Sequence, residues 1–223
     1  MTRNEASQRV SAILQMYVAG QDPAQFDLLP KALTAGKLYE AYVLALISKQ
    51  LVLAEGLELM LMNANYVSLK SSPGPINRSY PYFLLRRSGH PIAEMWTDIE
   101  FISLSHGLRP SGAPTRGEYH ELDIAIVDPN LIGRPTNNQV WLAVECKNTG
   151  YTKGLLKEIL GVRRELSLLK DEQPTRFHAW PRASLPCAPP SCLLVYSSDS
   201  GVMQYARPGE VFGIDFHYEE LAL

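Results

Sequence analysis

The chain has 223 residues, of which 46% are hydrophobic and 20% are charged, and its formal net charge is −2. These proportions are those of a folded globular protein with a sizeable core. The slightly negative charge excludes a basic field over the whole molecule, so binding to nucleic acid would require a local basic patch.

The three cysteines, Cys146, Cys187 and Cys192, are an odd number without a disulfide framework, which indicates a reducing compartment. The first residues lack the apolar stretch of a signal peptide, and the longest apolar run, 41–47, is too short to span a membrane. We therefore expect a cytoplasmic protein without a membrane partner. Cys187 and Cys192 with His178 lack a second ligand pair at the usual spacing, so no zinc site is expected.

Hydrophobic periodicity and turn residues predict a mixture of helices and strands. In chain order they are helices at 5–18 and 34–53, strands at 82–86, 92–104, 119–127 and 139–147, a helix at 153–169, a strand at 192–196 covered on both faces, and a short C-terminal β segment. Residues 55–62 fit either a continued helix or a strand.

The segments between these elements are rich in turn residues. The first helix ends near Gly20, turns follow at Pro23 and Pro30, and loops are predicted at 71–75 and 106–117, with an irregular proline-rich link at 174–190. No internal repeat is present. We expect an N-terminal helical extension over 1–30 and a single compact domain over 31–223.

Three charged side chains interrupt two apolar strands: Asp123 in the strand at 119–127, and Glu145 and Lys147 in the strand at 139–147. Strict alternation of side chains predicts apolar faces made of Leu122, Ile124 and Ile126 in the first strand, and of Val140, Leu142, Val144 and Cys146 in the second. The two acids and the lysine then meet on the opposite faces. Because unpaired buried charges are costly, the cluster indicates mutual pairing or a metal ion, and we favour the metal.

These residues resemble the motif of the PD-(D/E)XK nuclease superfamily. In that superfamily an acid ends the second core strand, a (D/E)-X-K triplet lies on the third, and a further acid often comes from the preceding helix. Here Asp123 matches the first acid, the triplet Glu145-Cys146-Lys147 matches the second motif, and Glu40 matches the helical acid. One departure is Leu122, which stands where the superfamily has a proline.

The resemblance covers about residues 34–200 and implies an α/β fold, with a restriction-endonuclease-like mixed central sheet flanked by helices in the core order αβββαβ. It also implies a metal-dependent nuclease that hydrolyses phosphodiester bonds. The expected form is a DNA endonuclease acting in restriction, anti-phage defence or repair.

The carboxylates of this motif are hard oxygen ligands, which suit Mg²⁺ or Mn²⁺. We expect Asp123 and Glu145 to bind the ion directly, with the backbone carbonyl of Cys146 as a third ligand. Glu40 would hold a second ion or a metal-bound water. Lys147 would polarise the attacking water or stabilise the charge that develops during hydrolysis.

The helix at 153–169 adds a basic face whose predicted phosphate contacts are Lys153, Lys157, Arg163 and Arg164. The expected partner is therefore nucleic acid, in the first place DNA. Target choice would depend on the loops at 71–79 and 106–117, on a homodimer or on a partner subunit.

Two alternatives remain open. One is a catalytically silent protein of the same fold that acts as a nucleic-acid-binding or assembly subunit. The other is an unrelated α/β protein in which Asp123, Glu145 and Lys147 form a structural ion-pair cluster.

Overall fold

The computed structural model describes residues 3–18, 33–64, 66–67, 69–70, 72–110, 112–170, 176–177, 180–181 and 185–221. Its helices are α1 (Arg3–Tyr17), α2 (Ala35–Leu53), α3 (Leu104–Leu108), α4 (Lys153–Leu166) and α5 (Ala206–Glu210). Its strands are β1 (Glu58–Met62), β2 (Tyr82–Arg87), β3 (His90–Ile102), β4 (Tyr119–Val127), β5 (Val140–Lys147), β6 (Leu168–Leu169), β7 (Cys187–Ala188), β8 (Cys192–Ser197) and β9 (Ile214–Tyr218).

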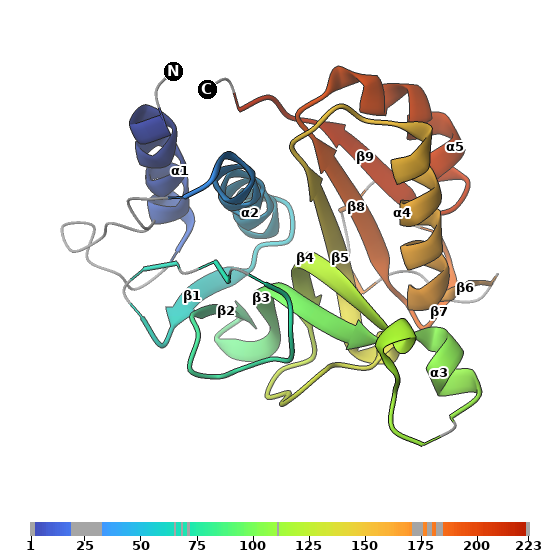
Figure 1. Cartoon of the computed structure of the whole chain (residues 1–223). Coiled ribbons are helices and arrows are strands. Elements are labelled where there is room, and N and C mark those ends of the chain that lie inside the picture. The colour runs from blue at the N-terminus through green and yellow to red at the C-terminus, as the bar shows by residue number, and fades with distance from the viewer. Residues whose placement is uncertain are drawn as a thin grey trace.

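Seven of these strands form one mixed sheet in the order β1-β2-β3-β4-β5-β8-β9. Neighbouring strands from β1 to β5 are antiparallel, whereas β8 is parallel to β5 and β9 is parallel to β8. Figure 1 shows α1 and α2 on one side of the sheet and α4 and α5 on the other. The structure therefore confirms an α/β protein with a mixed sheet flanked by helices.

Two hydrophobic cores fill the space between the helices and the sheet. The α2 core joins α1 and α2 to one face and includes Leu14, Leu44, Met95, Ile124 and Leu142. The α4 core lies on the other face and includes Trp96, Phe101, Ala125, Ile159 and Val195. Full burial of one such side chain stabilises the fold by about 1.5–3 kcal/mol, so both helical layers are held firmly to the sheet.

Helix α2 carries the first two charged residues of the site in its first turns. Thr34 caps the helix, because its hydroxyl accepts a hydrogen bond from the Lys37 N–H at 3.2 Å. Beyond Glu40 the helix is buried on nearly all sides. The packed helix therefore presents Lys37 and Glu40 at a defined place beside the sheet.

Strand β3 changes the facing of its side chains at Asp98, whose φ is 50°. Ala93 and Met95 lie in the α2 core, whereas Ile99 and Phe101, on the other side of Asp98, lie in the α4 core. A positive φ is uncommon for a residue other than glycine and turns the backbone locally. Regular alternation therefore fails along this strand.

The predicted strand faces are wrong at two positions for related reasons. Leu122 lies in the α4 core, although Ile124 and Ile126 lie in the α2 core, and Leu122 pairs with Ile99 just beyond the irregular Asp98. Val140 also lies in the α4 core, because the register between β4 and β5 shifts between Ile126 and Val127. A β-bulge of this kind reverses the facing of the residues beyond it.

Strands β4 and β5 stop pairing with one another just before the charged residues. Their last pair is Ile124 with Val144, yet β5 continues to pair with β8 as far as Lys147 and Ser197. Asp123 and Glu145 therefore lie where the two strands separate.

Most predicted elements agree with the structure. Residues 58–62 form a strand, which is one of the two alternatives left open for 55–62. Two predictions need correction: the helix at 153–169 ends at Leu166 because 168–169 belong to β6, and the loop at 106–117 begins within α3. The turns at Gly20, Pro23 and Pro30 and the side chain of His178 lie outside the described residues.

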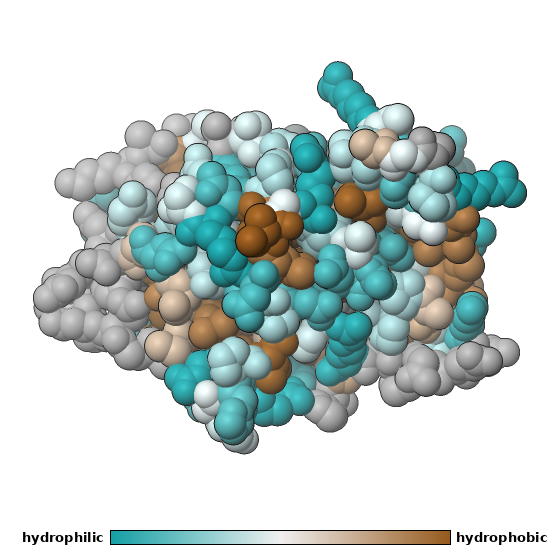
Figure 2. All heavy atoms as spheres, turned by 90° about the horizontal axis from the view of Figure 1, so that it is seen from below, coloured by the Kyte–Doolittle hydropathy of each residue, from teal (hydrophilic) through white to brown (hydrophobic). Residues whose placement is uncertain are grey.

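None of the described helices is both long and apolar enough to cross a membrane. Figure 2 shows one face of the molecule, on which hydrophobic side chains lie in separate groups among hydrophilic ones.

Candidate functional site

Three carboxylates from three separate elements meet beside the end of the β4–β5 pairing. Glu40 comes from α2, Asp98 from β3 and Asp123 from β4, and one oxygen of each lies within 4.8 Å of one oxygen of the other two. Asp98 is almost fully buried, with 1% of its surface exposed, and Glu40 and Asp123 are half-buried. Like charges at this separation repel, so the group requires compensating positive charge.

Lys37 supplies part of that charge. Its ammonium donates to Asp98 Oδ1 at 2.5 Å and to Glu40 Oε2 at 2.6 Å. The second oxygen of Asp98, Oδ2, is buried and has no hydrogen-bond partner among the described residues. A buried acceptor of this kind is uncommon in native proteins and calls for a physical explanation.

Asp123 connects this group to the Glu145-Cys146-Lys147 triplet. Its Oδ2 accepts a hydrogen bond from the Cys146 N–H at 2.6 Å, across the place where β4 and β5 separate. Next to it the Lys147 ammonium lies 3.0 Å from Glu145 Oε2 and 3.4 Å from Glu158 Oε1 of α4. We refer to Glu40, Asp98, Asp123 and Glu145, with Lys37 and Lys147, as the acid cluster.

Burial raises the pKa values of the acids in this cluster. Burial, together with the negative charge of Asp123, raises the pKa of Glu40 to about 7 and that of Glu145 to about 8. Burial also raises the pKa values of Asp98 and Asp123, against the opposing effects of Lys37 on Asp98 and of the Cys146 N–H on Asp123.

The two lysines of the cluster behave in the opposite way. Burial alone would lower the pKa of Lys37 and of Lys147, but the neighbouring carboxylates outweigh it and hold both pKa values above the ordinary 10.5. With all groups ionised, four carboxylates face two ammonium groups. These six groups then carry a net charge of −2, which attracts a further cation.

The four predicted catalytic residues are brought together, but the sequence analysis missed three neighbours. The acid cluster contains all four, which are Glu40, Asp123, Glu145 and Lys147. Cys146 donates its N–H to Asp123, and its side chain packs on the α2 core, as predicted. The role of its carbonyl oxygen stays a prediction. The missed residues are Lys37, Asp98 and Glu158.

The basic face predicted for α4 needs one correction. Lys153, Lys157 and Arg164 are exposed, but Arg163 is buried, with 3% of its surface exposed. Its guanidinium donates to Phe212 O and to the hydroxyls of Ser167 and Ser191. Arg163 therefore joins α4 to the segments beneath it and cannot contact a phosphate at the surface.

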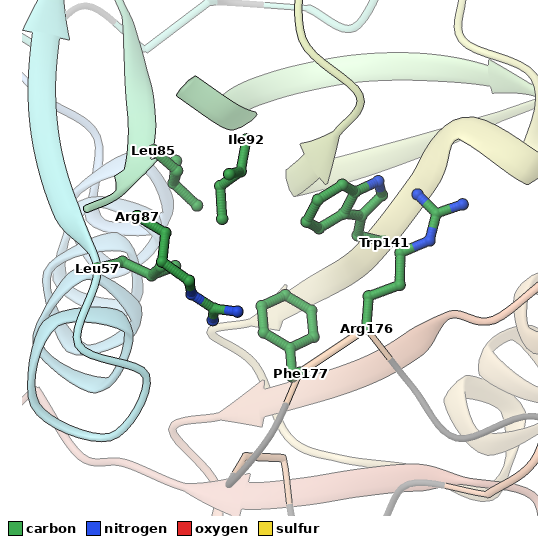
Figure 3. A pocket seen from close by; sticks show the side chains of 7 residues that line it. All are labelled: Leu57, Leu85, Arg87, Ile92, Trp141, Arg176 and Phe177. Carbon is green, nitrogen blue, oxygen red and sulfur yellow. The ribbon is translucent and has the colours of Figure 1, made fainter. Parts of the chain in front are cut away.

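A separate pocket of about 430 Å³ lies beside the opposite end of β5 (Figure 3). It is lined by Leu57, Leu85, Arg87, Ile92, Trp141, Arg176 and Phe177. Both arginines already have acidic partners, since Arg87 pairs with Glu55 at 3.1 Å and Arg176 pairs with Asp128 at 3.0 Å. The pocket contains none of the predicted site residues.

In comparisons with known proteins, the chain matches no family model, no curated protein and no solved structure.

Proposed function

We propose that this protein is a metal-dependent nuclease of the PD-(D/E)XK type, in which Glu40, Asp123, Glu145 and Lys147 form the active site. One observation carries the proposal. The carboxylate of Asp123 accepts the N–H of Cys146, the central residue of the triplet, at 2.6 Å, while Glu40 lies in the same cluster. The acids that the motif separates in sequence are thus neighbours in space.

The residues present suit a divalent cation. Carboxylate oxygens are the ligands that Mg²⁺ and Mn²⁺ prefer, and Asp123, Glu145 and Glu40 supply them. Such an ion would lower the pKa of a bound water and stabilise negative charge on the phosphate.

Lys147 would act on the same reaction as a fixed positive charge. Its ammonium is held at 3.0 Å by Glu145, one of the proposed ligands, so it lies next to the reacting groups. During hydrolysis a water oxygen attacks phosphorus, the water loses a proton and the bond to the leaving oxygen breaks. Lys147 would orient that water or stabilise the phosphoryl oxygens.

The surface beside the cluster supports a nucleic-acid substrate. Glu158 of α4 lies 3.4 Å from the Lys147 ammonium, so this helix adjoins the site. Lys153, Lys157 and Arg164 of the same helix are exposed and would contact backbone phosphates without recognising sequence. A DNA endonuclease in restriction, anti-phage defence or repair, with Mg²⁺ or Mn²⁺, is the form that we propose.

The test is cleavage of supercoiled DNA, linear DNA, single strands and RNA in the presence of Mg²⁺, Mn²⁺ or EDTA. We expect metal-dependent cutting, with supercoiled DNA nicked or linearised. The variants Asp123→Asn and Lys147→Met should each reduce the rate by about 100-fold or more, because each removes a group that acts on the transition state.

Asp128→Asn is the matched control, since Asp128 follows the far end of β4 and its Oδ1 accepts hydrogen bonds from Trp141 and Arg176. It should cut like the wild type. Failure of the folded wild-type protein to cut any of these substrates would overturn the proposal for the isolated chain and favour a silent nucleic-acid-binding subunit.

A further inference from the structure

Asp98 is the residue of the acid cluster that the nuclease motif does not account for. Its backbone has a φ of 50° within β3, and its side chain lies with those of Glu40 and Asp123. Its Oδ2 is buried without a hydrogen-bond partner among the described residues. Lys70 lies nearby: its charge and its backbone N–H oppose the rise in the pKa of Asp98, and its ammonium donates to the backbone oxygen of Asp98 at 3.5 Å.

The hydrogen bonds within the cluster leave an opening for a cation. Asp98 and Glu40 each have one oxygen bound by Lys37, and Asp123 has one oxygen bound by the Cys146 N–H. Among the described residues, no hydrogen bond reaches the second oxygen of any of the three. The three carboxylates carry a charge of −3 when ionised, and a divalent cation would offset more of it than the single ammonium of Lys37 does.

From this arrangement we propose that Asp98 is a direct ligand of the divalent cation, together with Glu40 and Asp123. In the metal-free protein the Lys37 ammonium binds Glu40 and Asp98 in place of the cation, and the cation displaces it. The inference deepens the proposed function and rests on it only for the catalytic use of the ion.

Lys37 cannot keep its position once a divalent cation is bound to Glu40 and Asp98. Its ammonium lies 2.5 and 2.6 Å from oxygens of these two residues, so an ion bound to the same pair would be a close neighbour of like charge. The Lys37 side chain is 21% exposed and belongs to the first turn of α2, so solvent is within its reach. Ion binding therefore releases the ammonium to water.

The experiment is calorimetric titration of the metal-free full-length protein with Mn²⁺ and with Mg²⁺. Asp98→Asn should weaken Mn²⁺ binding by about tenfold or more, because it replaces a charged carboxylate ligand with a neutral amide of nearly the same shape. Lys37→Met should have the opposite effect and strengthen binding by about tenfold, because the competing ammonium is gone.

Two matched variants control for charge. Asp128→Asn removes a carboxylate five positions after Asp123, and Lys49→Met removes an exposed lysine from the same helix as Lys37. Both should bind Mn²⁺ like the wild type. Unchanged binding in Asp98→Asn, or unchanged or weaker binding in Lys37→Met, would overturn the proposal.

A second measurement uses the wild-type protein alone and does not depend on the folding of any variant. Acylation of Lys37 by an amine-reactive reagent, followed by mass spectrometry, should become several-fold faster on addition of Mn²⁺, while Lys49 reacts at a constant rate. Slower or unchanged labelling of Lys37 would contradict its displacement.

These results are separable from those of the cleavage assay. Mn²⁺ binding that depends on Asp98, without cleavage of any substrate, would support the cation site and reject the nuclease. Metal-dependent cleavage with Mn²⁺ affinity unaffected by Asp98→Asn would support the nuclease and reject Asp98 as a ligand. A folded wild type that binds neither ion rejects the cation site.

Discussion

Strand β3 carries two buried acids, Glu94 and Asp98, that are held in opposite ways. Glu94 accepts two hydrogen bonds from Arg78 at 2.9 Å, one from the Trp96 indole at 3.0 Å and one from the Asn130 N–H at 3.0 Å. Asp98, four residues later, has Lys37 on one oxygen and no hydrogen-bond partner among the described residues on the other. Both side chains are almost inaccessible to water.

The bonding around the two side chains distinguishes a structural acid from an acid that we propose binds a cation. Glu94 has donors on both oxygens, and one nitrogen of Arg78, Nη2, donates to both of them, so neither oxygen is left without a hydrogen bond. Asp98 has a strained backbone, acidic neighbours and one oxygen without a hydrogen bond, so a cation could bind to that oxygen. Burial is common to the two regions, so only the bonding around each acid separates them.

The largest expected effect is at Glu94. Arg78→Met leaves a buried carboxylate without its counter-ion, so we expect the free energy of unfolding to fall by about 3 kcal/mol, measured by urea denaturation. Arg134→Met is the control, because its pair with Glu100 is partly exposed on both sides and should contribute less than about 1 kcal/mol. Equal losses of unfolding free energy in the two variants would show that the buried Arg78–Glu94 pair stabilises the fold no more than the partly exposed Arg134–Glu100 pair.

Addition of a metal should separate the two acids directly. At an Mn²⁺ concentration about 100 times its dissociation constant, ion binding stabilises a protein by about 2.7 kcal/mol. We expect this gain in the wild type and in Glu94→Gln, and a much smaller gain in Asp98→Asn at the same concentration. Thermal denaturation with and without Mn²⁺ measures it, and an equal gain in all three proteins would contradict the distinction.

Neutralising an acid should change the free energy of unfolding in opposite directions in the two regions. Burial and the charge of Asp123 raise the pKa of Glu145 to about 8, so its ionised form opposes folding. In EDTA at pH 8, Glu145→Gln should stabilise the protein by about 2 kcal/mol while removing a proposed ligand. Glu94→Gln should destabilise it, because Arg78 loses its anion. Chemical denaturation of both variants decides whether the signs differ.

The smallest expected effect, counted per group and per pH unit, is the change of the free energy of unfolding with pH. The pKa values of Glu40 and Glu145 are raised from 4.5 to about 7 and about 8, so the folded protein binds more protons than the unfolded chain between these limits. In EDTA the stability should therefore be greatest near pH 5 and fall towards pH 8, by at most about 1.4 kcal/mol per pH unit for each group.

The midpoint of urea denaturation as a function of pH measures this slope. Glu145→Gln should reduce it, and Mn²⁺ should reverse or flatten it, because ion binding requires deprotonated carboxylates. A stability that rises from pH 5 to pH 8 in EDTA would show that burial does not control these acids.

The sequence predicted the elements that depend on local pattern. The bounds of β4 and the positions of α2 and β8 follow from periodicity, capping and a continuous apolar run, which are properties of neighbouring residues. Glu40, Asp123, Glu145 and Lys147 were identified because they form a motif with recognisable spacing.

The sequence could not assign the residues whose roles depend on distant partners. Arg163 resembles its exposed neighbour Arg164 in sequence, yet it is buried by contacts with Ser191 and Phe212, which lie far along the chain. Leu122 faces the α4 core because of the irregular backbone at Asp98, and Val140 faces it because of the register shift between β4 and β5. Strict alternation of side chains predicts neither.

For Glu94 and Asp98, too, the role of each residue depends on partners that are distant in the sequence. By itself the sequence determined that both acids lie in one strand, predicted at 92–104, because the periodicity and composition of a strand are local properties. Only the tertiary structure decided that Arg78 closes the bonding of the first, whereas Lys37, Glu40 and Asp123 leave that of the second open. The physical reason is that the energy of a buried charge depends on the groups that folding brings within a few ångströms.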